Sequence, residues 1–314
     1  MAKMIDYPHG VHGVDAEYER PTKAAVHLVV EQGRVAVVDT GTVHSLPRVM
    51  EALAALGLGP GAVDWVLLTH VHLDHAGGAG AMLAHCPAAR LVVHPRGVRH
   101  MQDPSRLWEG AAAVYGTEAV RRLYGDPLPV AAERVVEASE GLELSLAGRP
   151  LRILDTPGHA RHHVCIWDEA SRGFFTGDTF GLSYRELDVA GRPFIFPTTT
   201  PVQFEPEALH ASVDRMLAFE PAAMYLTHFG RVEDVARLAA DFHRLLDAHV
   251  AVALAAPRGA GRFEAILAGL TRLVVEESRR QGWTLAVAEA LEVLAMDLEL
   301  NAQGLEVWLD NRAA

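Results

Sequence analysis

The sequence predicts an α/β fold, and three observations lead to this prediction. Short runs of apolar and β-branched residues alternate with stretches of helical periodicity, the pattern of helices packed on sheets. Half of the 314 residues are hydrophobic, enough for one large core or a core with a smaller appendage. After about residue 231 the strand signal disappears and only helical spacing continues. We therefore expect an α/β part, residues 1–231, followed by an α-helical extension, residues 232–314.

The amino-terminal part is predicted to open with a hairpin and a helix. Residues 25–31 and 34–39 are apolar and β-branched, and Gln32-Gly33 between them is typical of a hairpin turn. Residues 45–56 then predict a helix, because a serine can cap its start, a proline suits its first turn and apolar residues recur at helical spacing.

Further strands follow in two series. Residues 63–69 and 90–94 predict core strands, and the second series is predicted at 134–137, 142–144, 151–155, 163–168 and 173–176. Residues 96–130, between the two series, hold Trp108 and Tyr115 among helix formers, so we expect a helical insertion there. Two interpretations stay open: the insertion covers a pocket, or it packs an extra helical pair onto the sheet.

The extension after residue 231 is predicted to be helical throughout. Apolar residues recur at helical spacing from Leu238 to Pro257, then from Phe263 to Gly282, and again from Leu291 to Leu298. Proline and glycine end the first two stretches, as they commonly do at helix termini.

The densest chemical signal is the segment His70-Val71-His72-Leu73-Asp74-His75. It follows directly on an apolar run, residues 63–68, and leads into Gly77-Gly78. Imidazole and carboxylate are ligands of zinc, iron and manganese, and four of them on one short turn can face two ions. The glycines allow the backbone to fold tightly behind the turn. The segment therefore predicts a metal site.

This segment resembles the metal-binding motif of the metallo-β-lactamase superfamily. The superfamily's other motifs occur in the same order, at Asp39 in Val-Val-Asp-Thr-Gly, His159 in Asp-Thr-Pro-Gly-His, Asp178 in Thr-Gly-Asp-Thr and His228 in Tyr-Leu-Thr-His. The resemblance covers roughly residues 24–230. It implies an αββα sandwich, two layers of sheet with outer helices, to which the helical insertion and the carboxyl-terminal extension are added.

The resemblance also implies a ligand set for two divalent metal ions. Zinc is the expected metal, and iron or manganese are the alternatives. One ion would take His70, His72 and His159, the other would take Asp74, His75 and His228, and Asp178 would bridge them. Asp39 would orient the ligands from outside, since metal-bound side chains need outer hydrogen bonds to fix tautomer and angle.

The function implied is hydrolysis of a small ester, lactone or thioester by a hydroxide that bridges the two metals. Asp74 and Asp178 would then be catalytic as well as metal ligands. Tyr184 follows the Asp178 loop, where a phenol could stabilise an oxyanion. The alternatives are an oxidoreductase resembling the mononuclear iron persulfide dioxygenases, a phosphodiesterase, and a metal-binding module without activity. Complete retention of Asp74, His75 and His228 favours the dinuclear hydrolase.

The sequence also departs from the glyoxalase II branch of the superfamily that it resembles. His159 lies 89 positions after His70, a longer separation than is usual there, because the aromatic insertion falls between them. The helical extension contains arginines but no lysine, so its likeness to a glutathione-binding helical domain is only general. A glutathione thioester is therefore not the favoured substrate.

The composition restricts the classes of binding partner that we expect. The net charge is −12 and the only lysines are Lys3 and Lys23, so no basic stripe is available to neutralise nucleic-acid phosphates. The amino terminus lacks an apolar signal region, and no window approaches 18 uninterrupted apolar residues. Two isolated cysteines, Cys86 and Cys165, fit a reducing compartment. We expect a cytoplasmic protein with a small-molecule substrate and neither a nucleic-acid nor a membrane partner. A homo-oligomer is compatible with the sequence.

Overall fold

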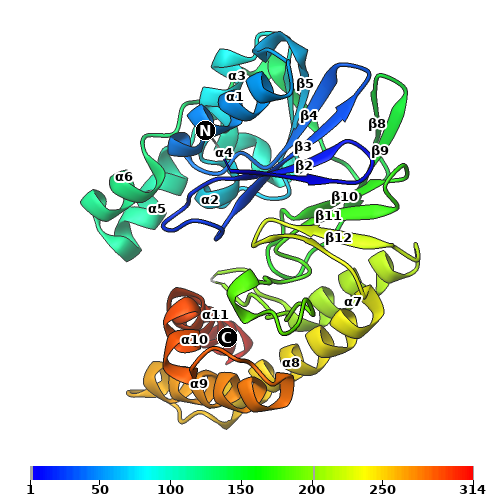
Figure 1. Ribbon diagram of the computed structural model, residues 1–314. Coiled ribbons are helices and arrows are strands. Elements are labelled where there is room, and N and C mark those ends of the chain that lie inside the picture. Colours follow the sequence, from blue (N-terminus) through cyan, green and yellow to red (C-terminus); the bar gives the residue numbers. More distant parts are fainter. Residues whose placement is uncertain (1–2, 201, 314) are drawn as a thin grey trace. The chain divides into compact units, whose positions relative to one another are not determined.

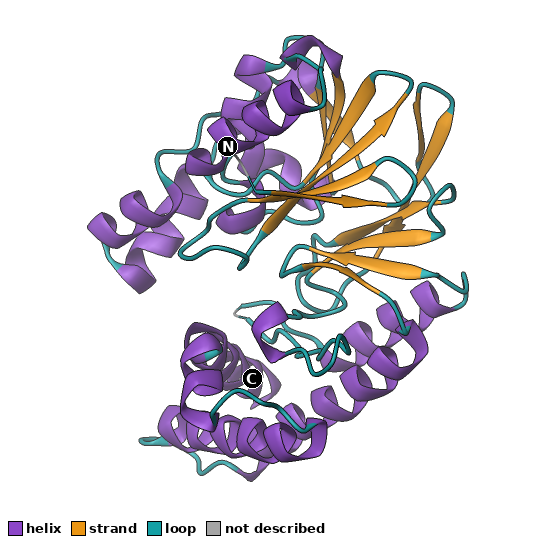
Figure 2. Ribbon diagram, in the orientation of Figure 1, coloured by secondary structure: helices purple, strands orange, loops and turns teal. Residues whose placement is uncertain are grey.

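Two units make up the chain, and both β-sheets lie in the first of them (Figures 1 and 2). In this computed structural model residues 3–200 and 202–313 are described, with all side chains except those of 114, 115 and 313. Unit 1 comprises Met1–Asp155, His162–Gly177 and Glu220–Glu233. Unit 2 comprises Thr156–Arg161, Asp178–Phe219 and Asp234–Ala314. The domain boundary expected at residue 231 stays a prediction.

The first sheet has seven strands that follow one another in chain order. The first four are antiparallel neighbours, whereas β4 to β7 run parallel. Gln32 and Gly33, at φ of 45° and 76°, make the predicted hairpin turn between β3 and β4. The strands are β1 (Met4–Tyr7), β2 (Val11–Asp15), β3 (Ala25–Glu31), β4 (Arg34–Val38), β5 (Val63–Leu67), β6 (Arg90–Val93) and β7 (Val135–Glu137).

The second sheet has six strands in the order β13-β12-β11-β10-β9-β8, and only β11 and β12 pair in parallel. They are β8 (Glu143–Leu146), β9 (Arg149–Asp155), β10 (Val164–Asp168), β11 (Gly173–Gly177), β12 (Ala223–Leu226) and β13 (Gly230–Val232). Four strands are additional to the predicted ones: β1, β2, β12 and β13. They are three to five residues long, and so short a run carries little periodicity of its own.

Parallel strands require crossover connections, and in the seven-stranded sheet the helices of unit 1 supply them. These helices are α1 (Leu46–Ala55), α2 (Leu73–Ala76), α3 (Ala79–His85), α4 (Val98–Gln102), α5 (Ser105–Tyr115) and α6 (Thr117–Tyr124). Helices α4 to α6 are the helical insertion predicted at 96–130. Short 3₁₀ turns connect the elements of both units: η1 (Val43–Ser45), η2 (Pro60–Ala62), η3 (Pro95–Gly97), η4 (Ala132–Arg134) and η5 (Arg185–Leu187).

Two apolar clusters stabilise unit 1. The inner cluster joins one face of each sheet, for example Val38 and Leu67 with Ile166 and Phe175. The outer cluster joins the other face of the seven-stranded sheet to the crossover helices, for example through Val37 and Leu53. Alternate residues of one strand, such as Val37 and Val38, therefore enter different clusters, as the period of a β-strand requires. Unit 1 is a two-sheet sandwich with a helical layer outside one sheet.

Unit 2 is helical apart from its loops. Its helices are α7 (Pro206–Leu217), α8 (Val235–Ala255), α9 (Arg262–Gln281), α10 (Val287–Val293) and α11 (Ala295–Ala313). Helices α8 and α9 end next to Pro257 and Gly282, as predicted, and Gly282 has the φ of 72° typical of a residue that closes a helix. Among the described residues, no helix is both long enough and apolar enough to cross a membrane.

Candidate metal centre

Asp39 is the centre of a buried hydrogen-bond network in unit 1. It directly follows β4, and Thr69 follows the neighbouring parallel strand β5, so the two residues meet at one edge of the sheet. The Asp39 carboxylate is fully buried and accepts bonds from the Thr69 amide at 2.9 Å, the Thr69 hydroxyl at 2.9 Å and the Thr227 hydroxyl at 2.8 Å. Its Oδ2 also lies 2.8 Å from His75 Nδ1. Asp39 therefore connects three segments.

Three predicted ligands of unit 1 converge beside this network. In the group Asp74, His75 and His228, one ligand atom from each residue lies within 4.8 Å of the others. His75 Nε2 is 3.6 Å and His228 Nε2 is 3.3 Å from Asp74 Oδ2. Both imidazoles are buried, and the Asp74 side chain is 21% exposed. Such a set of one carboxylate and two imidazoles suits zinc, iron or manganese.

The outer hydrogen bonds show why this cluster suits a cation. His75 Nδ1 faces the Asp39 carboxylate, and His228 Nδ1 faces the Lys23 carbonyl oxygen at 2.9 Å. Both partners are acceptors, so each Nδ1 carries a proton and donates it. In the neutral tautomers each Nε2 is then left with a lone pair directed toward the Asp74 carboxylate. A cation between these atoms removes the repulsion, and the residues therefore fit a metal.

His70 and His72, on the same loop, are brought together as well. His70 Nε2 lies 2.9 Å from His72 Nδ1, and His70 Nδ1 is 3.2 Å from the Thr69 hydroxyl. Gly77 and Gly78, which follow the loop, are needed because neighbouring backbone atoms leave no room for a side chain. A Cβ on Gly77 would lie 2.4 Å from the Leu73 carbonyl oxygen, and one on Gly78 would lie 2.8 Å from the Thr42 carbonyl oxygen. The glycines thus permit the tight loop through close backbone approach.

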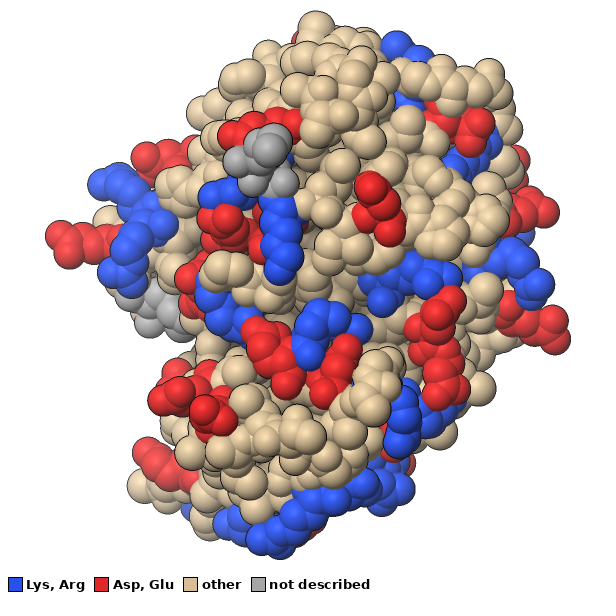
Figure 3. Space-filling model, in the orientation of Figure 1, with Lys and Arg blue, Asp and Glu red and all other residues tan. Residues whose placement is uncertain are grey.

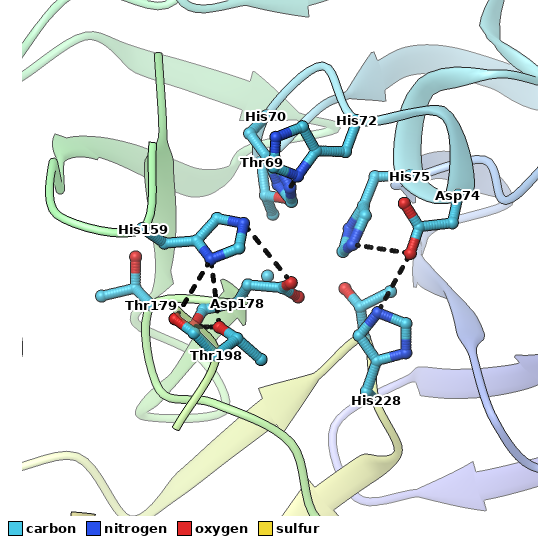
Figure 4. A network of polar contacts seen from close by, with 12 residues as sticks. Thr69, His70, His72, Asp74, His75, His159, Asp178, Thr179, Thr198 and His228 are labelled. Carbon is cyan, nitrogen blue, oxygen red and sulfur yellow. Dashed lines mark hydrogen bonds and ion pairs between the residues drawn. The ribbon is translucent and has the colours of Figure 1, made fainter. Parts of the chain in front are cut away.

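Unit 2 carries the two remaining predicted ligands, His159 and Asp178. His159 Nε2 is 3.6 Å from Asp178 Oδ2, and both side chains are more than 90% buried. The Thr198 hydroxyl donates to the Asp178 carbonyl oxygen at 3.1 Å and lies 3.1 Å from His159 Nδ1, so it can accept the imidazole proton. His159 Nε2 is then directed toward a carboxylate, the relationship seen for His75 and His228. Figure 4 labels the side chains of both units.

A glycine positions His159. Gly158 has a φ of 137°, and a Cβ there would lie 2.3 Å from the Cα of Leu209 on α7. A side chain at this position would be strained in its backbone and would also collide with the helix. The glycine of the Asp-Thr-Pro-Gly-His motif therefore allows the loop to pack against α7.

The predicted catalytic tyrosine is engaged elsewhere in unit 2. Tyr184 is fully buried, and its hydroxyl donates to Asp297 Oδ1 at 3.2 Å. Its role as an oxyanion stabiliser stays a prediction. In the helical insertion, Trp108 packs against the outer cluster of unit 1 and donates from Nε1 to the Gly125 carbonyl oxygen at 3.2 Å. The side chain of Tyr115 lies outside the described part.

Three contributors to the part of the site in unit 1 were not predicted: the hydroxyls of Thr69 and Thr227, and the carbonyl of Lys23. The two threonines had a signal in the sequence. The tripeptide Leu-Thr-His occurs at residues 68–70 and again at residues 226–228, each time at the end of a strand and with the histidine a predicted ligand. A backbone carbonyl such as that of Lys23 leaves no such signal.

Comparison with known proteins identifies the family and the fold. The family model described as the metallo-beta-lactamase superfamily matches residues 20–228, two thirds of the chain. The chain belongs to the metallo-β-lactamase superfamily. Its α/β sandwich with a helical extension is the fold of that superfamily, as predicted. The crystal structure of an archaeal superfamily member from Sulfolobus tokodaii, at 22% identity, superimposes with a TM-score of 0.65 over 96% of this chain and 99% of that one.

The sequence matches within the superfamily cover a smaller share of each chain than the structural superposition does. The sequence of the same archaeal protein, named under Sulfurisphaera tokodaii, is 26% identical over 71% of this chain and 79% of its own. A hydroxyacylglutathione hydrolase from Aeromonas hydrophila is 29% identical over 65% of this chain and 60% of its own. An acyl-coenzyme A thioesterase from Gallus gallus is 31% identical over 51% and 59%. The matches to the last two span only about three fifths of those relatives.

Proposed function

We propose that this superfamily member is a dinuclear metal-dependent hydrolase that cleaves a small ester, lactone or thioester. The observation that carries the proposal is the cluster of Asp74, His75 and His228, in which outer hydrogen bonds direct both Nε2 atoms toward one carboxylate. The proposed ligands of the two ions, with zinc preferred over iron or manganese, are His70, His72, Asp74, His75, His159, Asp178 and His228.

When bound, the ions would supply Lewis acidity, which polarises a scissile carbonyl and makes water acidic enough to be a nucleophile near neutral pH. The protein's own contribution is preorganisation. Asp39 fixes the tautomer of His75, and the Lys23 carbonyl fixes that of His228, before any ligand arrives. Because Asp39 is itself held by two threonines, the imidazoles lose little freedom on binding. Asp178, already paired with His159, would be the ligand shared by the two ions.

The substrate class rests on chemistry and on the relatives. The names of two relatives specify thioester hydrolysis, one of a hydroxyacylglutathione and one of an acyl-coenzyme A. The net charge of −12 favours a small neutral or apolar acyl compound over a polyanion. On the face in Figure 3, acidic and basic side chains are interspersed over much of the surface, in keeping with a small-molecule substrate instead of a nucleic acid.

The test is chelator-sensitive hydrolysis across a panel of lactones, carboxylic esters, acyl thioesters and phosphodiesters. We expect cleavage of a member of the first three classes, loss of activity on chelation and recovery when zinc, manganese or iron is restored. Metal-loaded protein that cleaves no member of the first three classes would contradict the proposal. Phosphodiester cleavage would then favour the phosphodiesterase alternative, and oxygen consumption with a persulfide would favour the oxygenase.

A further inference from the structure

A second cluster of imidazoles and carboxylates lies in unit 2, between two adjacent helices. His210 and Asp214 are four residues apart on α7, and His243 and Asp247 are four residues apart on α8. Residues at this spacing share one face of a helix. Each helix therefore presents one imidazole and one carboxylate to the other, and none of the four residues belongs to the metal centre proposed above.

The two imidazoles face each other through the same atom. His210 Nδ1 lies 2.7 Å from His243 Nδ1, and the ring planes are 18° apart with their centroids at 4.9 Å. The outer nitrogens face carboxylates crosswise: His210 Nε2 is 3.1 Å from Asp247 Oδ1, and His243 Nε2 is 3.2 Å from Asp214 Oδ1. His210 Nε2 is hydrogen-bonded to Asp247, whereas His243 Nε2 and Asp214 form an ion pair by distance. With a proton on each Nε2 beside its carboxylate, the two Nδ1 lone pairs face each other.

Two lone pairs at this distance need a positive charge between them, either one shared proton or a metal ion. The carboxylate behind each imidazole is the arrangement that metal-binding histidines use, because it fixes the tautomer and makes the facing nitrogen a better donor. Burial, together with the charge of His210, lowers the pKa of His243, while Asp214 opposes this shift. The neutral form, which is the metal-binding form of an imidazole, is thereby favoured.

We propose that His210 and His243 form a second, separate metal site, in which a late divalent transition metal such as copper(II), nickel(II) or zinc replaces the shared proton. Two nitrogens around one tetrahedral ion at ~2.0 Å are about 3.3 Å apart, so the rings need to separate by only about half an ångström. The imidazole side chains are 27% and 25% exposed, so the ion has access and water can complete its coordination. Copper(II) should bind most tightly of these ions.

The experiment titrates copper(II) into the protein with its own metals retained, and compares wild type with His243→Gln. Bound copper is counted by equilibrium dialysis, and its nitrogen ligands are identified by electron paramagnetic resonance. We expect wild type to bind one more ion than the variant, with a signal split by two imidazole nitrogens that the variant lacks. If the two proteins bind copper with equal stoichiometry and affinity and give the same spectrum, the proposal is overturned. His210 and His243 would then be a pair that only shares a proton.

Two further variants test whether the loss of copper is specific to the pair of His210 and His243. His12→Gln removes another imidazole–carboxylate pair, in which His12 Nδ1 is 2.7 Å from Asp6 Oδ1 and no histidine of the described part faces it. This variant should bind copper as wild type does. Loss of the same ion in His12→Gln would contradict the assignment. Asp247→Asn retains both ligands and also covers the case in which His243→Gln does not fold. It should keep the stoichiometry and weaken the affinity about 10- to 100-fold; unchanged affinity would count against the site.

Discussion

The carboxylate of Asp39 lies 2.8 Å from Nδ1 of His75, and both side chains are almost completely buried. The same carboxylate accepts hydrogen bonds from the hydroxyls of Thr69, which precedes His70, and Thr227, which precedes His228. One residue therefore sets the positions of the loop after β5 and the segment after β12. A change at Asp39 should alter metal binding without removing a metal ligand.

We expect Asp39→Asn to weaken metal binding about 10- to 100-fold, the usual cost of losing an outer hydrogen-bond partner of a ligand. The amide cannot accept at both of its positions, so the His75 tautomer is no longer fixed. Metal retained after dialysis against a graded series of chelator concentrations measures the effect. Asp64→Asn, which changes a partly exposed carboxylate bound by Arg34, is the control and should retain metal as wild type does. Equal retention in Asp39→Asn would remove Asp39 from the site.

Asp178→Ala should lower kcat for the substrate found in the panel by at least about a hundredfold, the scale for losing a directly acting catalytic group. Asp178 pairs with His159 in unit 2 at 3.6 Å, and the proposal assigns it both ions. Circular dichroism should show that the fold persists. Asp126→Ala, which removes an exposed carboxylate, should leave kcat unchanged. A loss of less than tenfold in Asp178→Ala would reject its bridging role.

The ion pair of Arg149 and Asp168 should be essential to unit 1. Both side chains are buried in the six-stranded sheet, with Arg149 Nε 2.8 Å from Asp168 Oδ1. Asp168→Ala leaves a buried guanidinium without this partner, so we expect unfolding free energy to fall by about 3 to 5 kcal/mol. Asp64→Ala breaks the more exposed pair with Arg34 and should cost only about 0 to 1 kcal/mol. Denaturant titration measures the unfolding free energy of both variants. Similar losses in Asp168→Ala and Asp64→Ala would contradict the essential role of the buried pair.

His249 should make stability depend on pH. Burial lowers the pKa of this imidazole to about 4, partly offset by its hydrogen bond to the Leu245 carbonyl. The unfolded chain, with a pKa of about 6.5, then binds more protons, so stability is complete above pH 6.5 and is lost as pH falls toward 4. Between pH 7 and pH 5 wild type should lose about 2 kcal/mol more unfolding free energy than His249→Leu. Equal losses in urea titrations at the two pH values would refute this prediction.

Much of the fold follows from local patterns in the sequence. The hairpin at Gln32-Gly33 and the end of α9 before Gly282 are fixed by turn and capping residues, and the structure has both. Strands β1, β2, β12 and β13 could not be predicted in this way, because each is only three to five residues long and shows little alternation of its own. Helix α7, also not predicted, has a mixed composition around Pro206.

The candidate metal ligands could be proposed from the sequence, whereas the groups that hydrogen-bond to them could be anticipated only in part. His70 to His75 stand in one hexapeptide, and the convergence of Asp74, His75 and His228 follows the expectation from the superfamily. The hydrogen bond from His228 to the Lys23 carbonyl could not be predicted, because any residue offers a backbone carbonyl. The facing pair of His210 and His243 was equally hidden, since each histidine looks ordinary on its own helix.

Elemental analysis of the purified protein after mild dialysis tests the dinuclear assignment most directly. The account predicts two divalent ions per chain, with zinc as the main metal, and the loss of one of them from a variant that carries both Asp74→Ala and His228→Ala. Because copper binding by His210 and His243 is assayed separately, His243→Gln should still carry both ions. A reproducible single iron per chain, unchanged in the Asp74→Ala, His228→Ala variant, would contradict the dinuclear hydrolase and favour a mononuclear oxygenase.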